Sequence, residues 1–234
     1  KVGRRLAIKV LNASKFALSF GEVEGDLAAA VTEPLDRSML AALADVVRSA
    51  TTGFEAWDYT RSLEITESFF WSFCDDYLEL VKDRAYGGQG EGGAASARAA
   101  LRIALGVLLR LFAPILPYVT EEVWSWWREG SVHRQAWPLP AEALPEGMPG
   151  DPGMLAAVGE ALGAVRKTKS EAKVGMRAEI TSMTLAAPQP VLDAVAAAVG
   201  DLRATGRIGQ LEYAVAEDVE VRDAVLVPVE KPTA

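Results

Sequence analysis

The sequence predicts a mainly α-helical protein, in which a helix bundle is followed by a small α/β module. Apolar residues recur every three to four positions through most of the first 137 residues, as amphipathic helices require. The stretch 138–153 then holds five of the twelve prolines. Helix and strand patterns alternate after it, which indicates a sheet covered by helices. We therefore predict a bundle over 1–137, a linker over 138–153 and an α/β module over 154–234.

Five helices are expected in the first part, over 1–20, 36–52, 60–86, 94–112 and 121–128. Asp36 is a suitable N-cap for the second helix, and Thr120 can cap the fifth. The third helix should end at Gly87, because glycine commonly follows a helix C-terminus. Pro114 ends or kinks the fourth helix. Long helices with short connections are typical of a helix bundle.

The last part of the chain alternates between the two kinds of pattern. We expect helix 154–172, strand 178–186, helix 189–203 and strands 208–215 and 219–229. This order predicts one small sheet with helices packed against it.

Composition excludes several classes of function. One cysteine, Cys74, and one histidine, His133, rule out a disulfide framework, a multi-cysteine zinc site and a histidine pair for metal binding. The longest apolar run, 101–119, is interrupted by arginine and proline, so no membrane span is expected. No signal-peptide pattern opens the chain, which favours the cytoplasm. The first residue is Lys1 and helix begins at once, so we expect a fragment of a longer protein.

Basic residues are concentrated in two places on an acidic chain. The net charge is −8, yet residues 1–15 hold five basic residues and no acid. A second group lies at 166–177 and includes Lys167, Lys169 and Lys173. Two basic groups on an acidic body indicate selective docking to an anionic partner rather than non-specific coating.

No catalytic or metal-binding constellation is found. Gly88, Gly90 and Gly93 match the spacing G-x-G-x-x-G, but a predicted helix precedes them where a dinucleotide site needs a strand. The acidic pair Asp75 and Asp76 points in two directions on a helix, so it does not form an acid–base site. We predict no catalytic residue and no metal ligand, and hence no enzyme activity for this chain alone.

The first helix carries an unusual polar stripe. Arg5, Lys9, Asn12 and Phe16 are spaced to lie on one face of an otherwise apolar helix. Arginine and aromatic side chains stack on unpaired bases and asparagine reads base edges, so the stripe suits single-stranded RNA. The alternative is an ordinary solvated face of an amphipathic helix.

A tryptophan cluster could likewise stack bases. It comprises Trp124, Trp126, Trp127 and Trp137. Because an indole buries a large area, a role in the core or in anchoring the linker is the more favoured interpretation.

Several segments together resemble a known family. They read KVGRRLAIKVLNASKF (1–16), FFWSFCDDYLELVKDR (69–84), PILPYVTEEVWSWW (114–127) and SVHRQAWP (131–138). They are similar to the anticodon-binding bundle of class I aminoacyl-tRNA synthetases for valine, isoleucine and leucine, and the second resembles the valine enzymes in particular. The segment AVRKTKSEAKVGMRAEI (164–180) is similar to the small α/β module that follows this bundle.

The resemblance implies binding to the anticodon stem and loop of valine tRNA, with the stripe of Arg5, Lys9, Asn12 and Phe16 near the anticodon. The parent enzyme would be a monomeric valine–tRNA ligase that uses ATP and Mg. Its HIGH and KMSKS motifs are absent here, so the fragment should need no cofactor and be inactive.

Two alternatives remain open. One is the same domain of an isoleucine–tRNA ligase, although the cysteine-rich zinc module of many such enzymes is missing. The other is a helical scaffold that binds proteins rather than RNA. The chain also lacks the coiled-coil arm that many valine enzymes use to touch the tRNA corner. Either the arm is absent from this lineage, or its role passes to the basic segment 166–177. On the second hypothesis, Lys167, Lys169 and Lys173 contact the tRNA.

Overall fold

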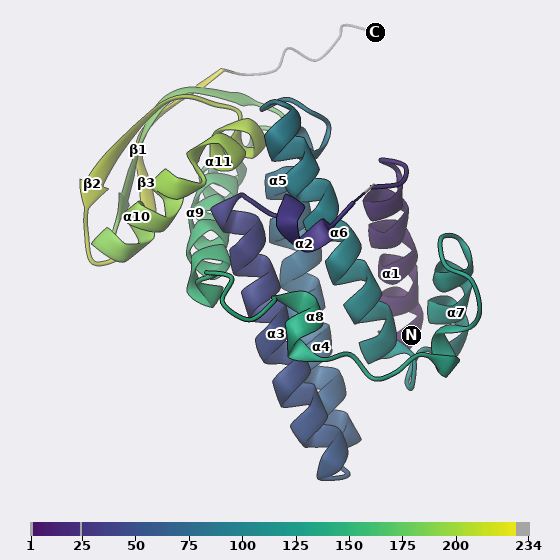
Figure 1. The fold of residues 1–234 in the computed structure, drawn as a ribbon. Coiled ribbons are helices and arrows are strands. Elements are labelled where there is room, and N and C mark those ends of the chain that lie inside the picture. The colour runs from purple at the N-terminus through teal and green to yellow at the C-terminus, as the bar shows by residue number, and fades with distance from the viewer. Residues whose placement is uncertain (1, 24, 228–234) are drawn as a thin grey trace, which may run out of the picture.

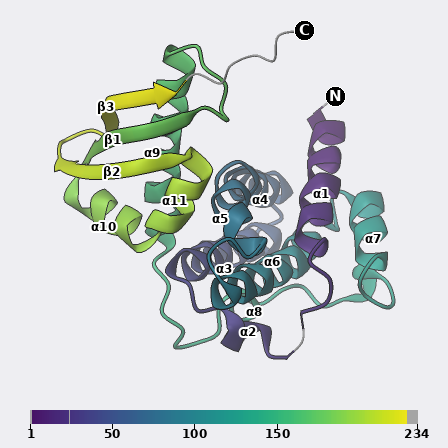
Figure 2. The ribbon, with the colours of Figure 1, turned by 90° about the horizontal axis from the view of Figure 1, so that it is seen from above.

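Long helices dominate the computed structural model, which describes residues 2–23 and 25–227. Figure 1 shows a group of helices on one side and a small sheet with its own helices on the other. The view from above separates the same two parts (Figure 2). The predicted class, a mainly α bundle followed by a small α/β module, is confirmed.

Helix α6 is the centre of the first part. The helices here are α1 (Val2–Leu18), α2 (Leu27–Ala30), α3 (Pro34–Glu55), α4 (Tyr59–Ser72), α5 (Leu78–Ala85), α6 (Glu91–Phe112) and α7 (Pro117–Ser125). α6 contacts each of the others. Small buried residues such as Ala97, Ala100 and Ala104 let its neighbours approach closely, while Leu101 and Leu109 fill the remaining space.

Two predicted helix starts are wrong. Helix α3 begins at Pro34, whose fixed φ angle suits the first turn, so Asp36 is not an N-cap. Asp36 lies inside that turn and is fully buried. Helix α7 likewise begins with a proline, Pro117, and the hydroxyl of Thr120 donates to the carbonyl of Leu116 within the helix.

The predicted third helix contains a local irregularity. Helices α4 and α5 follow one another along one rod, and the π-helical turn Phe73–Tyr77 joins them. The amide of Leu78 donates to the carbonyl of Phe73, five residues earlier. A turn of this kind inserts one extra residue into a helix and often marks a functional site.

The stretch predicted as a linker is ordered against the bundle. It contains the short helix α8 (Pro140–Ala143), which packs on α3 and α6. Ala143 is buried, and Glu142 pairs with Arg110 of α6 at 2.7 Å. The proline-rich segment therefore packs on the bundle instead of forming a separate linker.

The second part is built around one central strand. Its elements are α9 (Pro152–Glu171), β1 (Glu179–Ala187), α10 (Gln189–Ala197), α11 (Val199–Gly206), β2 (Ile208–Val215) and β3 (Glu220–Val227). The strand order is β2-β1-β3, with β1 parallel to β2 and antiparallel to β3. The predicted single helix 189–203 is divided at Ala198, and the predicted strand residues 228–229 lie outside the described residues.

A buried ionic cluster joins the two parts. Arg84 of α5 donates to Asp36 of α3 at 2.7 and 2.8 Å, and to Asp201 of α11 at 2.9 Å. The hydroxyls of Tyr77 and Ser96 donate to the same Asp36 carboxylate, at 2.7 and 2.6 Å. Burial alone would lower the pKa of Arg84, but its hydrogen bonds and charge pairing with Asp36 and Asp201 raise it above the ordinary value.

Gly93, the last glycine of the G-x-G-x-x-G spacing, lies in the first turn of α6 and makes room for this cluster. A Cβ atom there would lie 3.0 Å from Cδ of Arg84, and the Gly93 carbonyl accepts from that guanidinium at 3.2 Å. Of the three glycines in this spacing, Gly93 is the one that packs against the arginine.

Replacing Arg84 with alanine should strongly destabilise the chain. Two buried carboxylates, Asp36 and Asp201, would lose their counter-charge, and breaking such a pair costs about 3–5 kcal/mol. Urea unfolding measures the loss. The control is Arg48→Ala, because Arg48 pairs with Asp45 on the surface and such pairs contribute about 0–1 kcal/mol. Equal effects of both substitutions would contradict the stabilising role of the cluster.

Candidate nucleic-acid interface

Helix α1 separates an apolar side from a polar one. Its buried side packs toward α6 and α7 through Leu6, Val10, Ala13 and Ala17. The other side carries Arg5, Lys9, Asn12 and Phe16, the stripe expected from the sequence. Arg5 and Asn12 are exposed, whereas Lys9 and Phe16 are half-buried. The half-buried pair faces a neighbouring helix, so the stripe is one wall of a pocket.

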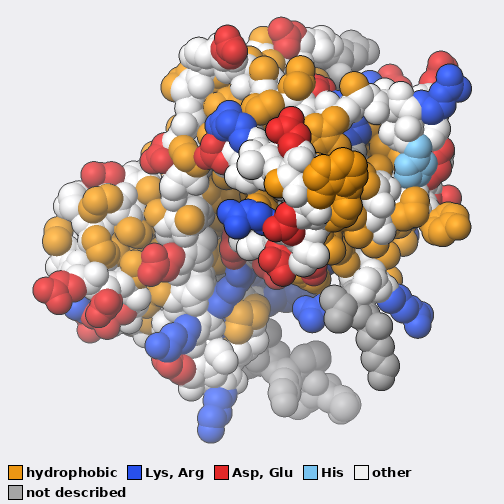
Figure 3. Space-filling view, turned by 90° about the horizontal axis from the view of Figure 1, so that it is seen from below, with side chains coloured by type: hydrophobic (Ala, Val, Ile, Leu, Met, Phe, Trp, Pro, Cys, Tyr) orange, Lys and Arg blue, Asp and Glu red, His pale blue; other side chains and the backbone are white. Residues whose placement is uncertain are grey.

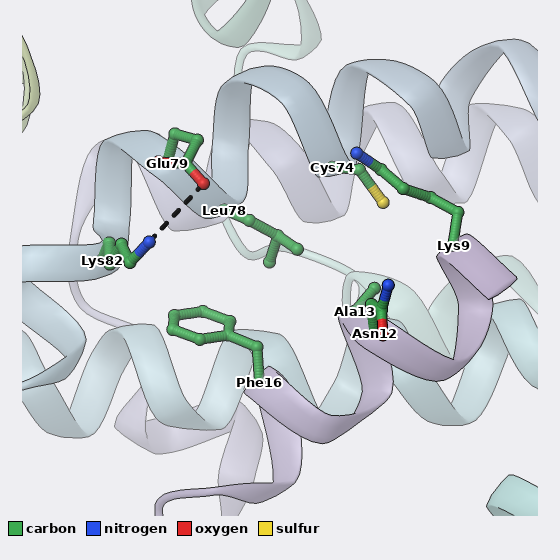
Figure 4. A pocket seen from close by; sticks show the side chains of 8 residues that line it. All are labelled: Lys9, Asn12, Ala13, Phe16, Cys74, Leu78, Glu79 and Lys82. Carbon is green, nitrogen blue, oxygen red and sulfur yellow. Dashed lines mark ion pairs between the residues drawn. The ribbon is translucent and has the colours of Figure 1, made fainter. Parts of the chain in front are cut away.

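That pocket lies between α1 and the rod of α4 and α5 (Figure 4), with a volume of about 220 Å³. Its lining residues are Lys9, Asn12, Ala13, Phe16, Cys74, Leu78, Glu79 and Lys82. Leu78 and the ring of Phe16 border its middle, and the ion pair of Glu79 with Lys82 (3.7 Å) closes one end. Pockets for drug-sized ligands measure about 300–1,000 Å³, so this one has room only for a smaller group.

The two cations of the stripe rest on an indole ring. The guanidinium of Arg5 lies 4.8 Å from the ring centroid of Trp71 on α4, and Nζ of Lys9 lies 5.6 Å from it. The indole N–H donates to Glu67 at 3.1 Å, which fixes the ring. Both cations thereby gain a favourable contact with one ring, and of the two only Lys9 lines the pocket.

Lys9 also has a carboxylate partner. Its Nζ lies 2.7 Å from Oδ1 of Asp75 in the π-helical turn, and the pair is partly exposed. On the other side of the turn, Arg166 of α9 pairs with Asp76 at 3.1 Å and donates to the carbonyl of Asp75. The turn is thus held between α1 and α9. Burial raises the pKa of Asp76, and the charge and hydrogen bond of Arg166 oppose that rise.

Cys74 lies at the base of the pocket but has no nucleophilic character. Burial raises the pKa of its thiol to about 12, while the nearby Lys9 charge lowers it by less. Only a thiolate is an effective nucleophile, so the side chain acts here as an apolar wall.

The second wall of the pocket was not predicted from the sequence. Cys74, Leu78 and Lys82 of that wall follow the spacing i, i+4, i+8 on the predicted third helix. This spacing also places residues on one face of a helix, so it could have been found. What could not be found is that the two helix faces meet, because neither pattern identifies its partner.

The second basic group is dispersed in the structure. Lys167 is exposed, 4.0 Å from Glu171, in a hollow that also contains Glu160 and Glu220. Lys173 is exposed just beyond the end of α9. Lys169 is only 2% exposed, so the prediction that it lies on the surface and contacts RNA is wrong.

Lys169 instead ties the end of α9 to that of α11. Its ammonium donates to the carbonyls of Gly206 at 2.7 Å and Met176 at 3.1 Å. Burial and the nearby charge of Arg207 lower its pKa. With its donors used by backbone carbonyls, Lys169 is not positioned to meet a phosphate.

The tryptophan cluster is mostly part of the core. Trp124 is buried, and Trp127 lies between Arg102 (5.3 Å to the ring centroid) and Arg128 (4.4 Å). Trp137 packs on Phe54, with centroids 4.8 Å apart, and its N–H donates to a threonine of α3. These contacts agree with the favoured anchoring role.

Residues 2–23 and 25–227 contain no group of three or more His, Cys, Asp or Glu side chains that could hold a metal ion. Within the same residues, no helix has the length and apolar character needed to cross a membrane.

Comparison with known proteins identifies what the chain is similar to. A family described as "Anticodon-binding domain of tRNA ligase" matches residues 36–184. The chain is 57% identical over 233 residues to the "Valine--tRNA ligase" of Thermobifida fusca, with 99% of this chain and 26% of that protein covered. It is 53% identical to the protein of the same name from Salinispora tropica, with 93% and 27% covered. The chain thus spans about a quarter of the length of these relatives.

The burial of Cys74 predicts slow chemical modification. At pH 8 a thiol with a pKa of about 12 is ionised roughly a thousand-fold less than an exposed thiol with a pKa near 8.5. Native protein should therefore react with a disulfide reagent about a thousand-fold more slowly than protein unfolded in urea. Equal rates in the two states would show that the pocket floor is open.

Proposed function

The chain belongs to the family of anticodon-binding domains of tRNA ligases, and we propose that its α1–α5 pocket binds an anticodon nucleotide of valine tRNA. The observation that carries this proposal is the composition of the pocket. An aromatic ring, an amide and cations surround a space of about 220 Å³. These are the groups that hold an unpaired base: a stacking surface, an edge reader and phosphate partners.

Each side chain has a distinct role in this proposal. Phe16 offers its ring for stacking, and Asn12 offers a donor and an acceptor to a base edge. Lys9 and Arg5 meet the phosphates on either side of the inserted nucleotide. Asp75 holds Lys9 in place before binding and is displaced, or shared, when a phosphate arrives. These roles follow from placement beside one pocket, and α1 alone supplies all four groups.

We also propose that the chain works within a longer valine–tRNA ligase, a monomeric enzyme of the cytoplasm that joins valine to its tRNA using ATP and Mg. The support is the similarity to valine–tRNA ligases roughly four times as long. By itself the chain is proposed to bind RNA without catalysing ligation.

The alternatives are less well supported. Relatives that are 50–57% identical carry the valine name, which favours valine over isoleucine. A scaffold that binds only proteins does not account for membership of an anticodon-binding family.

A second exposed aromatic surface is a poorer RNA site. At the hairpin of α3 and α4, Trp57 is 80% exposed and Tyr59 is 46% exposed. Glu55, Asp58 and Glu64 lie in the same segment and would repel phosphate. Figure 3 views this end of the molecule, where acidic, basic and hydrophobic side chains are interspersed and basic ones form no continuous area.

Substitutions in the pocket should separate stacking from base reading. Phe16→Ala should weaken binding to an RNA hairpin with the valine anticodon stem and loop roughly five- to 150-fold, since stacking on one base contributes about 1–3 kcal/mol. Asn12→Ala should reduce the preference for that hairpin over one with a changed anticodon base. Fluorescence anisotropy with labelled hairpins measures both.

The control is Trp57→Ala, which removes an exposed aromatic side chain from the α3–α4 hairpin and should leave affinity unchanged. If Asn12→Ala and Phe16→Ala both kept wild-type affinity and wild-type discrimination, the pocket would not be the anticodon site.

A further inference from the structure

Four exposed basic side chains meet at one corner of the α/β module. Lys173 and Arg177 lie in the turn between α9 and β1, and Arg203 and Arg207 lie at the end of α11. The Arg207 guanidinium donates to the carbonyl of Arg177 at 3.2 Å, which joins the two segments. We call these four residues the basic corner. Only one of them, Lys173, belongs to the RNA-contacting set expected from the sequence.

The basic corner stands beside the proposed anticodon pocket. The hydroxyl of Thr205, two residues before Arg207, donates to the carbonyl of Glu79 at 2.7 Å, and Glu79 lines the pocket. In Figures 1 and 2, α5 lies between α11 and α1. The stripe on α1 and the basic corner therefore flank the same helix from opposite sides.

Charge in the basic corner is not neutralised locally. None of its four side chains has an Asp or Glu oxygen within 4.0 Å among residues 2–23 and 25–227, whereas Lys9 and Arg166 each have one acidic partner and Arg84 has two. The Arg203 guanidinium donates two hydrogen bonds, to the carbonyls of Ile208 and Gly209. One acid, Glu179, lines the hollow of about 470 Å³ that Arg203 and Arg207 border. The corner remains cationic overall.

The backbone conformation at two of these residues allows their charge to be removed by a glycine substitution. Lys173 (φ 56°) and Arg207 (φ 51°) adopt the left-handed conformation just after α9 and α11, where glycine is the usual residue. A cation at this position stabilises the helix by interacting with the carbonyl end of its dipole, and this effect does not depend on RNA. Glycine would lose that benefit but relieve the strain of the left-handed backbone. Because these two effects on stability oppose each other, glycine removes the charge with little net loss of stability.

We propose that the basic corner binds RNA backbone phosphates of the anticodon stem, which adjoins the loop whose nucleotide enters the α1–α5 pocket. Arginine and lysine are the usual phosphate partners, and such contacts fix register without reading sequence. The α1 stripe would then hold one side of the RNA loop, and the α/β module would hold the other side. This inference rests on the proposed function, since it takes the pocket as the point where the loop enters.

The test is the double variant Lys173→Gly with Arg207→Gly, measured with the valine anticodon hairpin over a salt series. Affinity at about 50 mM salt should fall roughly ten-fold per lost phosphate contact, and the slope of log affinity against log salt should decrease by about 1.4–1.8. Discrimination between anticodon variants should be kept, because phosphate contacts carry no base information. The thermal midpoint should be unchanged or raised.

The matched control is Arg48→Ala with Arg61→Ala, which removes two positive charges from the α3–α4 hairpin and should leave the salt slope near the wild-type value. Wild-type affinity and slope in the glycine variant would overturn the inference, and would leave the proposed function standing if Phe16→Ala still weakened binding. A wild-type chain that binds no hairpin at any salt concentration would overturn both. Equal slope losses in the control would mean that only overall charge matters.

Discussion

The guanidinium of Arg84 lies where α3, α5 and α11 meet, and the relative placement of the two parts depends on it. It bridges Asp36 of the bundle and Asp201 of the α/β module, with all three side chains at most 5% exposed. A buried ionic cluster gains little stability over apolar packing, but it tolerates only one arrangement of its partners. Because Thr205 and Arg207 follow Asp201 on the same short helix, the cluster also sets where the basic corner stands relative to the pocket.

The π-helical turn gives the binding surface its local form. An extra residue between α4 and α5 places Cys74 in the pocket and directs Asp75 toward Lys9 and Asp76 toward Arg166. The turn is therefore held from both α1 and α9. An RNA phosphate that binds Lys9 would compete with Asp75, which lies in the turn that Arg166 contacts. The turn therefore connects the pocket to the α/β module.

The sequence predicted features with a periodic pattern and missed those that depend on distant partners. The helices, the strands and the stripe of Arg5, Lys9, Asn12 and Phe16 follow from spacing along one element. Asp36 was predicted as a cap because a carboxylate near a helix start usually is one, yet its partners are 41 to 60 residues away. Lys169 was expected on the surface because no local pattern shows that Gly206 and Met176 would surround its ammonium.

We propose that one RNA loop lies between α1 and the basic corner, over α5. Photo-crosslinking tests it most directly, with a reactive nucleotide placed first in the anticodon and then in the adjoining stem of the valine hairpin, followed by mapping of the modified residues. We expect the anticodon nucleotide to label residues 9–16 and 78–82, and the stem nucleotide to label residues 173–177 or 203–207. Labelling confined to the α3–α4 hairpin or to β3 would contradict it.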